Sequence, residues 1–216
     1  MAKRKEEMEI KYNIVVSGAA EVGHCCEKIE EISKEVGREI ARQRHTLVSG
    51  ATTGVPYFAA IGCNEEGGFN VGFSPAASEK EHLKAYKLPL DPFNIMIYTG
   101  ADYAGRDIIM TKSADAVIIV CGRIGTLHEF TTAVETGRII GVLEGTGGMA
   151  DKIRGIAESY CKIAKKIIYD RDPNWVAPYA YGDAGTAGSY GFEDDELPSI
   201  AFALLHRVSL DLGTLR

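Results

Sequence analysis

The sequence predicts an α/β protein built on a doubly wound parallel sheet of about seven strands, and three observations carry this prediction. Short apolar runs alternate with segments of helical periodicity from residue 10 to about residue 170. The runs are apolar at consecutive positions, as is typical of parallel strands that are covered by helices on both faces. Glycines follow the ends of most runs, where the chain has to turn from a strand into a helix. A chain of 216 residues is long enough for one well-buried domain.

Seven apolar segments predict the strands of this sheet. They cover residues 12–18, 45–50, 69–75, 92–100, 115–122, 138–145 and 165–170. Apolar residues spaced three or four apart indicate the helix after the first strand, namely Ile29, Ile32, Val36 and Ile40. A second helix is expected over residues 55–68, where a pair of glycines ends it. Further helices are expected at about Asp102–Ser113, Thr126–Thr136 and Met149–Tyr160.

The chain divides into three parts by composition. Residues 1–9 are a charged N-terminal segment, residues 10–171 hold the alternating strands and helices, and residues 172–216 form an acidic tail. The tail is rich in Gly, Ala and Tyr and lacks regular periodicity over most of its length, which predicts an irregular loop or linker. Residues 197–212 have the apolar pattern of a short amphipathic helix. We therefore expect a single domain with an irregular C-terminal tail.

Charge and hydropathy exclude several classes of function. The formal net charge is −6, and no stripe of Lys and Arg of the kind that binds nucleic acid is present. No apolar run approaches the roughly 20 residues that a membrane-spanning helix needs. The N-terminus, MAKRKEEMEIK, is charged and has no apolar core behind it, so a secretory signal is not expected. The sequence favours a cytoplasmic protein that binds a small molecule, without nucleic-acid or membrane partners.

The cysteines also favour a reducing compartment. The chain has five, an odd number without a CxxC pair, at Cys25, Cys26, Cys63, Cys121 and Cys161. Cysteines scattered through apolar segments usually behave as small core residues, so free thiols are expected. His24 beside two cysteines is the one cluster with metal-ligating side chains, but a closed zinc site needs four converging ligands. We therefore expect no metal site.

Two glycine-containing turns predict a ligand site at one edge of the sheet. SGAAEVG follows the first strand and SGATTGVP follows the second. Because the carboxyl ends of parallel strands meet at the same edge, both turns are expected to face one crevice. Neither matches GxGxxG or GxxxxGK[ST], and the alternative is that each is only a tight strand-to-helix turn. The candidate ligand-binding residues in these turns are Ser17, Gly18, Ala19, Gly50, Thr52, Thr53 and Gly54.

The third turn, CGRIGTLHE, allows two interpretations. Thr126 and Glu129 have the spacing of a capping box, in which both side chains cap a helix and bind no ligand. Glycine-spaced amides at the start of a helix also favour an anion such as phosphate, and Glu129 is then within reach of it. Arg106 lies one turn into the helix after the fourth strand, where acidic residues are usual. Either anion binding or an ion-paired surface position fits Arg106.

These motifs carry a family resemblance that spans about residues 10–170. Gly122-x-x-Gly125-Thr126-x-x-Glu129 resembles the PGGxGTxxE signature of the LONELY GUY (LOG) family, and Arg106-x-x-x-Met110 resembles its RKxxM element. The resemblance implies a Rossmann-like fold and a homodimer or higher homo-oligomer. It also implies a phosphoribohydrolase, which releases a free base from a nucleoside 5′-monophosphate. We expect no cofactor.

The resemblance assigns roles to individual residues of this chain. Arg106 and Glu129 match the catalytic pair of the family. Gly122, Gly125 and Thr126 match the residues that hold the 5′-phosphate. The chemistry fits, because cleavage of an N-glycosidic bond builds positive charge on the ribose, which a carboxylate stabilises.

The sequence departs from the family pattern at three positions. Cys121 stands where the signature has proline, Arg123 where it has its second glycine, and Asp107 where the RKxxM element has lysine. Arg123 either adds a contact to the phosphate or blocks the approach of the backbone to it. These departures keep an alternative function open, a non-catalytic carrier or sensor of a nucleotide-like ligand such as molybdenum cofactor.

Two histidines lie near these motifs. His128 adjoins Glu129, but neighbouring residues of a helix point about 100° apart, so His128 is expected outside the site. His82 follows the third strand, in a segment that is a candidate for covering the site.

Overall fold

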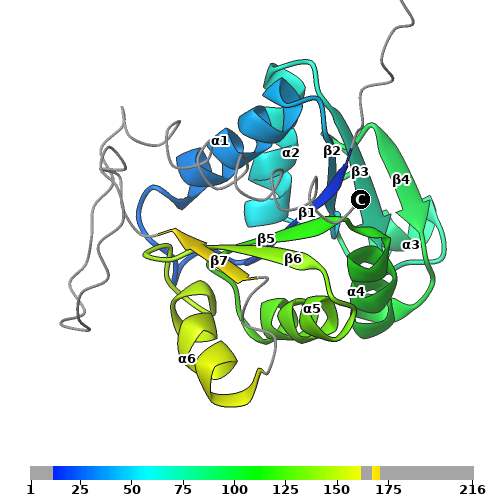
Figure 1. The fold of residues 1–216 in the computed structure, drawn as a ribbon. Helices are drawn as coiled ribbons and strands as arrows, with labels where there is room; N and C mark the ends of the chain where they lie inside the picture. Colours follow the sequence, from blue (N-terminus) through cyan, green and yellow to red (C-terminus); the bar gives the residue numbers. More distant parts are fainter. Residues whose placement is uncertain (1–11, 162–166, 171–216) are drawn as a thin grey trace, which may run out of the picture.

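The computed structural model describes residues 12–161 and 167–170, and in this part of the chain strands and helices alternate (Figure 1). The strands are β1 (Asn13–Gly18), β2 (Thr46–Ser49), β3 (Phe69–Ser74), β4 (Ile95–Tyr98), β5 (Ala116–Val120), β6 (Ile139–Leu143) and β7 (Ile167–Asp170). The helices are α1 (Ile29–Arg42), α2 (Val55–Glu65), α3 (Glu79–Lys84), α4 (Asp102–Ser113), α5 (Ile124–Glu135) and α6 (Ala150–Tyr160). Each of the seven predicted strands is present.

The strands form one sheet in the order β4-β3-β2-β1-β5-β6-β7, and every neighbouring pair is parallel. From β1 the chain steps outward to β4, and α4 then carries it back to β5 on the other side of β1. The predicted doubly wound α/β fold is confirmed. The strand order reverses between β1 and β5, and open sheets of this kind bind ligands outside the strand ends at such a point.

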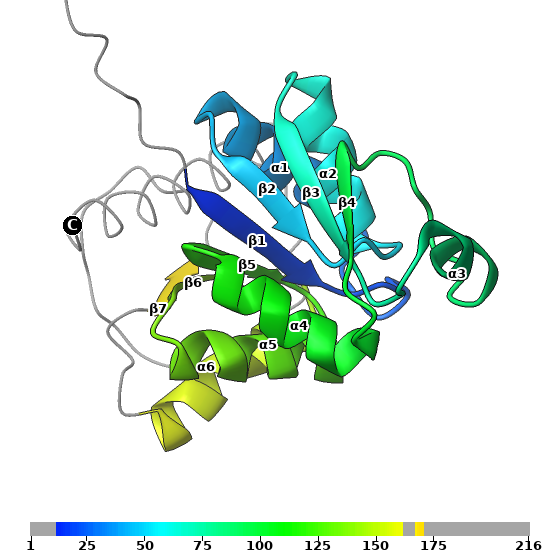
Figure 2. The same ribbon diagram turned by 90° about the vertical axis from the view of Figure 1, so that its right-hand side faces the viewer.

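Helices cover both faces of the sheet, because successive side chains of a strand point to opposite sides (Figure 2). In β1, Ile14 and Val16 pack with α1 and α2 on one face, whereas Val15 packs with α4, α5 and α6 on the other. All three side chains are fully buried. This burial on both faces explains why the strands are apolar at consecutive positions.

One helix, α3, was not expected from the sequence, and it contains His82. Ser78 caps α3 by accepting a hydrogen bond from the Glu81 amide at 3.3 Å. His82 is buried, with Nδ1 2.8 Å from Ser74 Oγ and Nε2 2.9 Å from the carbonyl oxygen of Pro89. His82 therefore anchors the segment after β3, and that this segment covers a ligand site stays a prediction.

Some predictions concern residues outside the described part of the chain. The N-terminal segment 1–9, the tail 172–216 and the helical pattern at 197–212 all fall there, so the predicted domain limits stay predictions. Among the residues that the structure describes, no helix is both long and apolar enough to cross a bilayer.

Helices α1 and α2 approach each other closely at two glycines. A Cβ atom on Gly37 of α1 would overlap the carbonyl oxygen of Ala59 in α2. In the same way, a Cβ atom on Gly62 of α2 would overlap the carbonyl oxygen of Lys34 in α1. Glycine costs about 1 kcal/mol relative to Ala in a helix interior. The two glycines are therefore explained by the close helix crossing and not by local helix preference.

Gly37→Ala is expected to destabilise the protein by about 2 kcal/mol or more, because the added methyl group has to push α1 away from α2. Gly155→Ala in α6 is the matched control, since a Cβ atom there meets nothing within 4 Å. That control should gain up to about 1 kcal/mol from helix preference. Urea unfolding of both variants measures the two effects. Unchanged or higher stability of Gly37→Ala would contradict the described packing of α1 on α2.

Candidate ligand site

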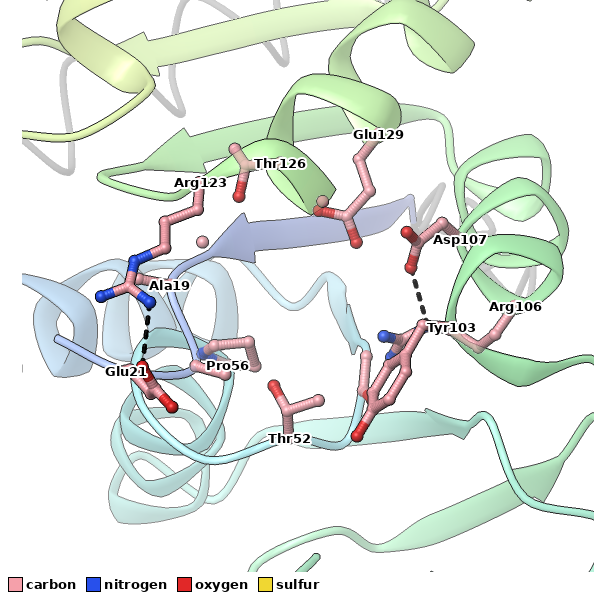
Figure 3. A pocket seen from close by; sticks show the side chains of 14 residues that line it. Ala19, Glu21, Thr52, Pro56, Tyr103, Arg106, Asp107, Arg123, Thr126 and Glu129 are labelled. Carbon is pink, nitrogen blue, oxygen red and sulfur yellow. Dashed lines mark hydrogen bonds and ion pairs between the residues drawn. The ribbon is translucent and has the colours of Figure 1, made fainter. Parts of the chain in front are cut away.

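A cavity of about 300 Å³ opens at the carboxyl ends of the strands, beside the reversal of strand order (Figure 3). Its walls come from the turns after β1 and β2, the first turns of α4, and the start of α5. The volume lies at the lower end of the range for small-molecule sites. The lining residues are Gly18, Ala19, Ala20, Glu21, Gly50, Thr52, Pro56, Tyr103, Arg106, Asp107, Arg123, Gly125, Thr126 and Glu129.

Most of the site residues that the sequence predicts line this cavity, and the others support its walls. Ser17, Thr53, Gly54 and Gly122 are the predicted ligand residues outside the lining. Thr53 Oγ1 donates to the carbonyl oxygen of Ala20 at 3.0 Å and so joins the turn after β2 to the turn after β1. Gly54 and Gly122 have φ angles of 71° and 96°, in the left-handed region that favours glycine. These residues shape the walls of the cavity.

Ala20 lines the cavity as expected for the turn after β1, whereas four lining residues were missed by sequence reasoning, namely Glu21, Pro56, Tyr103 and Asp107. Glu21 belongs to the turn SGAAEVG, of which residues 18–21 line the cavity. Tyr103 precedes Arg106 by three residues in α4, and residues so spaced share a helix face. Helical spacing was thus a usable signal for Tyr103. Asp107 carried no local signal beyond its departure from the family motif.

Helix α5 places Glu129 inside the helix, facing the cavity. The helix begins at Ile124, with Arg123 at the N-cap position and no side-chain capping bond. Thr126 and Glu129 therefore lie within the helix, and the capping-box interpretation is wrong. The Glu129 carboxylate instead accepts a hydrogen bond from Ser17 Oγ at the end of β1, and it points into the cavity (Figure 3). Only 7% of Glu129 is exposed.

The surroundings of Glu129 favour its protonated form. Burial is the largest influence and raises the pKa of Glu129 from 4.5 to about 7, and the negative charge of Asp107 acts in the same direction. The positive charge of Arg106 and the hydrogen bond from Ser17 lower the pKa and offset part of the increase. A carboxyl group with such a pKa is typical of functional sites, because it exchanges protons near neutral pH.

Arg106 lines the cavity, but its guanidinium is held by the surrounding backbone. Nη1 donates to the carbonyl oxygen of Phe73 at 3.0 Å and also to that of Gly50. A Cβ atom at Gly50 would overlap the guanidinium of Arg106, so a larger residue there would displace this group. Nε donates to Asp107 Oδ1 at 2.9 Å, and the other Asp107 oxygen lies 3.3 Å from His128 Nδ1. His128 is absent from the lining, in line with the expectation for it.

The start of α5 has the features of an anion site. The first amides of a helix have no partner within the helix, and its dipole adds partial positive charge there. No acidic residue lies in the first turn of α5. A Cβ atom on Gly125 would meet nothing within 4 Å, so the space beside it is open. Thr126 is buried beside it and adds a hydroxyl group to the wall. An anionic group of a ligand fits here.

The rim of the cavity beside α5 holds a cluster of side chains. Arg123 Nη1 pairs with Glu21 at 2.9 Å, and Arg123 Nε donates to His24 Nδ1 at 3.2 Å. His24 lies against a disulfide between Cys25 and Cys121, whose Cα atoms are 5.8 Å apart. The expectation of free thiols is therefore wrong for this pair. It holds for the remaining cysteines, Cys26, Cys63 and Cys161.

One group of potential metal ligands occurs in the described residues. The ligand atoms of His24, Cys25 and Cys121 lie within 4.8 Å of one another. Both sulfur atoms belong to the disulfide, so the group offers one nitrogen donor in this state.

The fold and the cavity define a Rossmann-like α/β protein with a buried carboxylate beside a candidate anion site. The chain belongs to the SLOG cluster4 family, whose profile matches residues 11–176. An uncharacterized protein of Archaeoglobus fulgidus is 32% identical over 127 residues, which cover 59% of this chain and 78% of that protein.

Solved structures share this fold at lower sequence identity. The X-ray structure of TM1055 has a TM-score of 0.63 and 24% identity, and the match covers 75% of this chain and 92% of that one. The molybdenum cofactor carrier protein of Chlamydomonas reinhardtii has a TM-score of 0.65 and 22% identity over 93% of this chain and 99% of its own. The molybdenum cofactor binding protein of Rippkaea orientalis has a TM-score of 0.57 and 22% identity, covering 74% and 89%. With the family match, the shared fold confirms the LOG-like superfamily that the motifs predict.

The raised pKa of Glu129 predicts a loss of stability as the pH rises from about 5 to about 8. In this window the folded state keeps a proton on Glu129, whereas an ordinary carboxyl in the unfolded state has released it. The change from 4.5 to about 7 corresponds to at most ~3 kcal/mol. Urea unfolding at both pH values measures the drop. Glu129→Gln should remove it, and Glu135→Gln, an exposed position on the same helix, should retain it. The same pH dependence in both variants would show that the pKa of Glu129 is close to that of an ordinary carboxyl group.

Proposed function

We propose that this protein binds a nucleoside 5′-monophosphate in the cavity and hydrolyses its N-glycosidic bond, giving a free base and ribose 5-phosphate. One observation carries the proposal. Glu129 is a buried carboxyl group that caps no helix, bonds to Ser17 and faces the cavity. A structural role would not require a carboxyl group here, because burial of its charge is unfavourable.

The phosphate of the nucleotide is proposed to lie at the start of α5. The open space beside Gly125, the hydroxyl of Thr126 and the helix amides converge there. The family motif gives Gly122, Gly125 and Thr126 the same role. The ribose then extends toward Glu129, which lies one helical turn after Thr126 on the same face.

The chemistry uses both protonation states that a pKa near 7 allows. Cleavage builds positive charge on the ribose ring, and ionised Glu129 stabilises this charge in a site of low dielectric constant. Glu129 also accepts a proton from the attacking water. The water oxygen bonds to ribose C1′, and the electrons of the N-glycosidic bond leave with the base. A substantial fraction of Glu129 is ionised at neutral pH, as this role needs.

Arg106 is proposed to act beside Glu129. It lines the cavity, and its positive charge opposes protonation of Glu129. Its bonds to Phe73 and Asp107 fix the guanidinium, so its orientation is set before a ligand arrives. The guanidinium is proposed to hold a ribose hydroxyl or a phosphate oxygen.

A carrier function is the second candidate, and Arg123 is the observation that favours it. Arg123 replaces a glycine of the family signature and lies at the rim, paired with Glu21. A charged side chain over the anion site favours retention of a ligand and not turnover. Two structures with this fold are described as a carrier and a binding protein of molybdenum cofactor. A nucleotide-like ligand such as this cofactor is therefore the alternative cargo.

The protein is further proposed to form a homodimer through α4 and α5. Ile108 and Ile109 of α4 and Ile124 of α5 are 41%, 45% and 76% exposed, and the two helices pack beside each other. Exposed apolar side chains on adjacent helices favour a subunit interface at these helices. A cytoplasmic location and the absence of nucleic-acid partners stay predictions.

Light scattering at micromolar concentration is expected to give the mass of a dimer. Ile109→Glu places a charge in the proposed interface and should shift the mass to that of a monomer. Leu83→Glu alters an exposed apolar residue of α3 and serves as the control, with the mass unchanged. A monomer mass for the unmodified protein would contradict the proposal.

Incubation with AMP and other common monophosphates is expected to release free base and ribose 5-phosphate. Glu129→Gln keeps the size of the side chain but removes the negative charge, so turnover should fall by a factor on the order of 10² or more. Chromatography of the products measures the rate, and calorimetry measures nucleotide binding, which should persist. Arg106→Ala should lose both binding and turnover.

Gly125→Ala separates binding from chemistry in the same experiment. The methyl group enters the open space proposed for the phosphate, so binding should weaken while the fold is kept. Tight binding of a monophosphate without any base release would favour the carrier function. Intact turnover of Glu129→Gln would remove Glu129 from the mechanism.

A further inference from the structure

The disulfide at the rim joins two segments that have different accessibility. Cys121 directly follows β5 and precedes Gly122, and it is fully buried. Cys25 lies in the segment between β1 and α1 and is half-buried. Attack on a disulfide requires access to one sulfur atom along the bond axis. Cys25 is the more exposed residue of the pair, so we infer that a reagent in solution attacks its sulfur atom and that the sulfur atom of Cys121 departs.

His24 is oriented to stabilise the departing sulfur. Arg123 Nε donates to His24 Nδ1 at 3.2 Å, so Nδ1 is an acceptor and Nε2 carries the hydrogen of the neutral ring. Nε2 lies 3.6 Å from Cys121 Sγ and 3.3 Å from the carbonyl oxygen of Gly122. The N–H group thus lies within reach of both the Gly122 carbonyl oxygen and the sulfur that becomes a thiolate when the bond breaks. A hydrogen bond to a thiolate makes it a better leaving group.

We propose that the Cys25–Cys121 disulfide is a thiol–disulfide exchange site for dithiol reductants, with Cys25 as the attacked sulfur and Cys121 as the leaving group. A thiolate of the reductant bonds to Cys25 Sγ, the protein disulfide breaks, and its electron pair goes to Cys121 Sγ. His24 Nε2–H stabilises that thiolate, which then takes a proton from water. The second thiolate of the reductant attacks its own sulfur in the mixed disulfide and releases Cys25 as a thiolate. The dithiol is oxidised, and the protein gains two thiols.

The same geometry disfavours a metal site made of these residues. A metal ion on His24 Nε2 needs the hydrogen on Nδ1, which would then face the N–H of Arg123 at 3.2 Å. Cys26, the neighbouring free thiol, does not replace the reductant, because burial raises its pKa and keeps it protonated. The cluster is therefore suited to exchange with an external thiol.

The state of the disulfide acts on the wall of the cavity. Cys121 has a φ of 55°, a left-handed conformation that is unusual for a residue with a Cβ atom, and the disulfide helps to hold it. Gly122 follows with a φ of 96°, and the chain then enters α5. Breaking the bond removes a restraint from the residues that approach the anion site. This consequence holds whichever ligand the cavity binds.

Mass spectrometry of the oxidised full-length protein tests the direction of attack. After incubation with excess reduced glutathione and alkylation of free thiols, glutathione is expected on Cys25 and the alkyl group on Cys121. Glutathione on Cys121 would overturn the proposal. So would an intact disulfide after hours in millimolar dithiothreitol under native conditions, because the bond would then be purely structural.

Two variants test the role of His24. His24→Ala should slow reduction by dithiothreitol by roughly 3- to 10-fold, because the leaving thiolate loses its donor. His24→Gln retains an N–H donor and should recover part of the rate. Cys26→Ser is the matched control, with an unchanged rate expected. A slower reaction of Cys26→Ser would mean that the disulfide exchanges through Cys26, and an unchanged rate of His24→Ala would mean that His24 is not involved. Either result overturns the proposed route.

Amide hydrogen exchange tests the effect on the cavity wall. Reduction should speed exchange in residues 121–125 and leave the α3 segment unchanged. Equal exchange in both redox states would show that the disulfide does not control this turn. The measurement needs no ligand, so its outcome is independent of the proposed hydrolase activity.

Discussion

The site depends on one constraint: after the neighbouring strands β1 and β5, the chain turns to opposite faces of the sheet. These strands are neighbours in the sheet, but α1 packs on one face and α5 on the other. Their carboxyl ends therefore open onto a common space that neither helix fills. Ser17 and Glu129 face each other across this space and form a hydrogen bond, although they are 112 residues apart in the sequence. The connectivity of the sheet brings the residues of the site together, and the glycines in the turns leave space for the cavity.

Two buried glutamates show what distinguishes the site from ordinary stabilising structure. Glu35 in α1 is as buried as Glu129, but Arg38 and Arg42 pair with its two oxygens at 2.8 and 2.6 Å. Its charge is compensated by direct partners. Burial and the negative charge of Asp107 raise the pKa of Glu129, although the hydrogen bond from Ser17 acts in the opposite direction. Stability alone gives no reason to keep such a group, whereas proton transfer near neutral pH does.

The sequence predicted the sheet and most of the cavity because both follow from local signals. Apolar runs identify strands, and glycines after them identify the turns at the carboxyl edge. The start of α5 was misjudged because Thr126 and Glu129 have the spacing of a cap, while the left-handed conformations of Cys121 and Gly122 begin the helix earlier. These conformations depend on tertiary contacts, such as the bond from the Cys121 amide to Thr146 Oγ1 at 2.8 Å. A disulfide that closes 96 residues of chain likewise leaves no local pattern.

The departures of this chain from the LOG signature form one physical unit. Cys121 replaces a proline and Arg123 replaces a glycine, and both side chains contact His24. Arg123 also lines the cavity, where an anion bound as proposed would compete with Glu21 for its guanidinium. Under the two proposals, the side chain that orients His24 toward the disulfide is also the side chain nearest the ligand. Ligand binding and disulfide exchange then act on each other through Arg123, and such coupling between binding equilibria is reciprocal by thermodynamic necessity. If the start of α5 binds an anion as proposed, Arg123 adds a charged side chain to a site that would otherwise consist of backbone amides and the Thr126 hydroxyl.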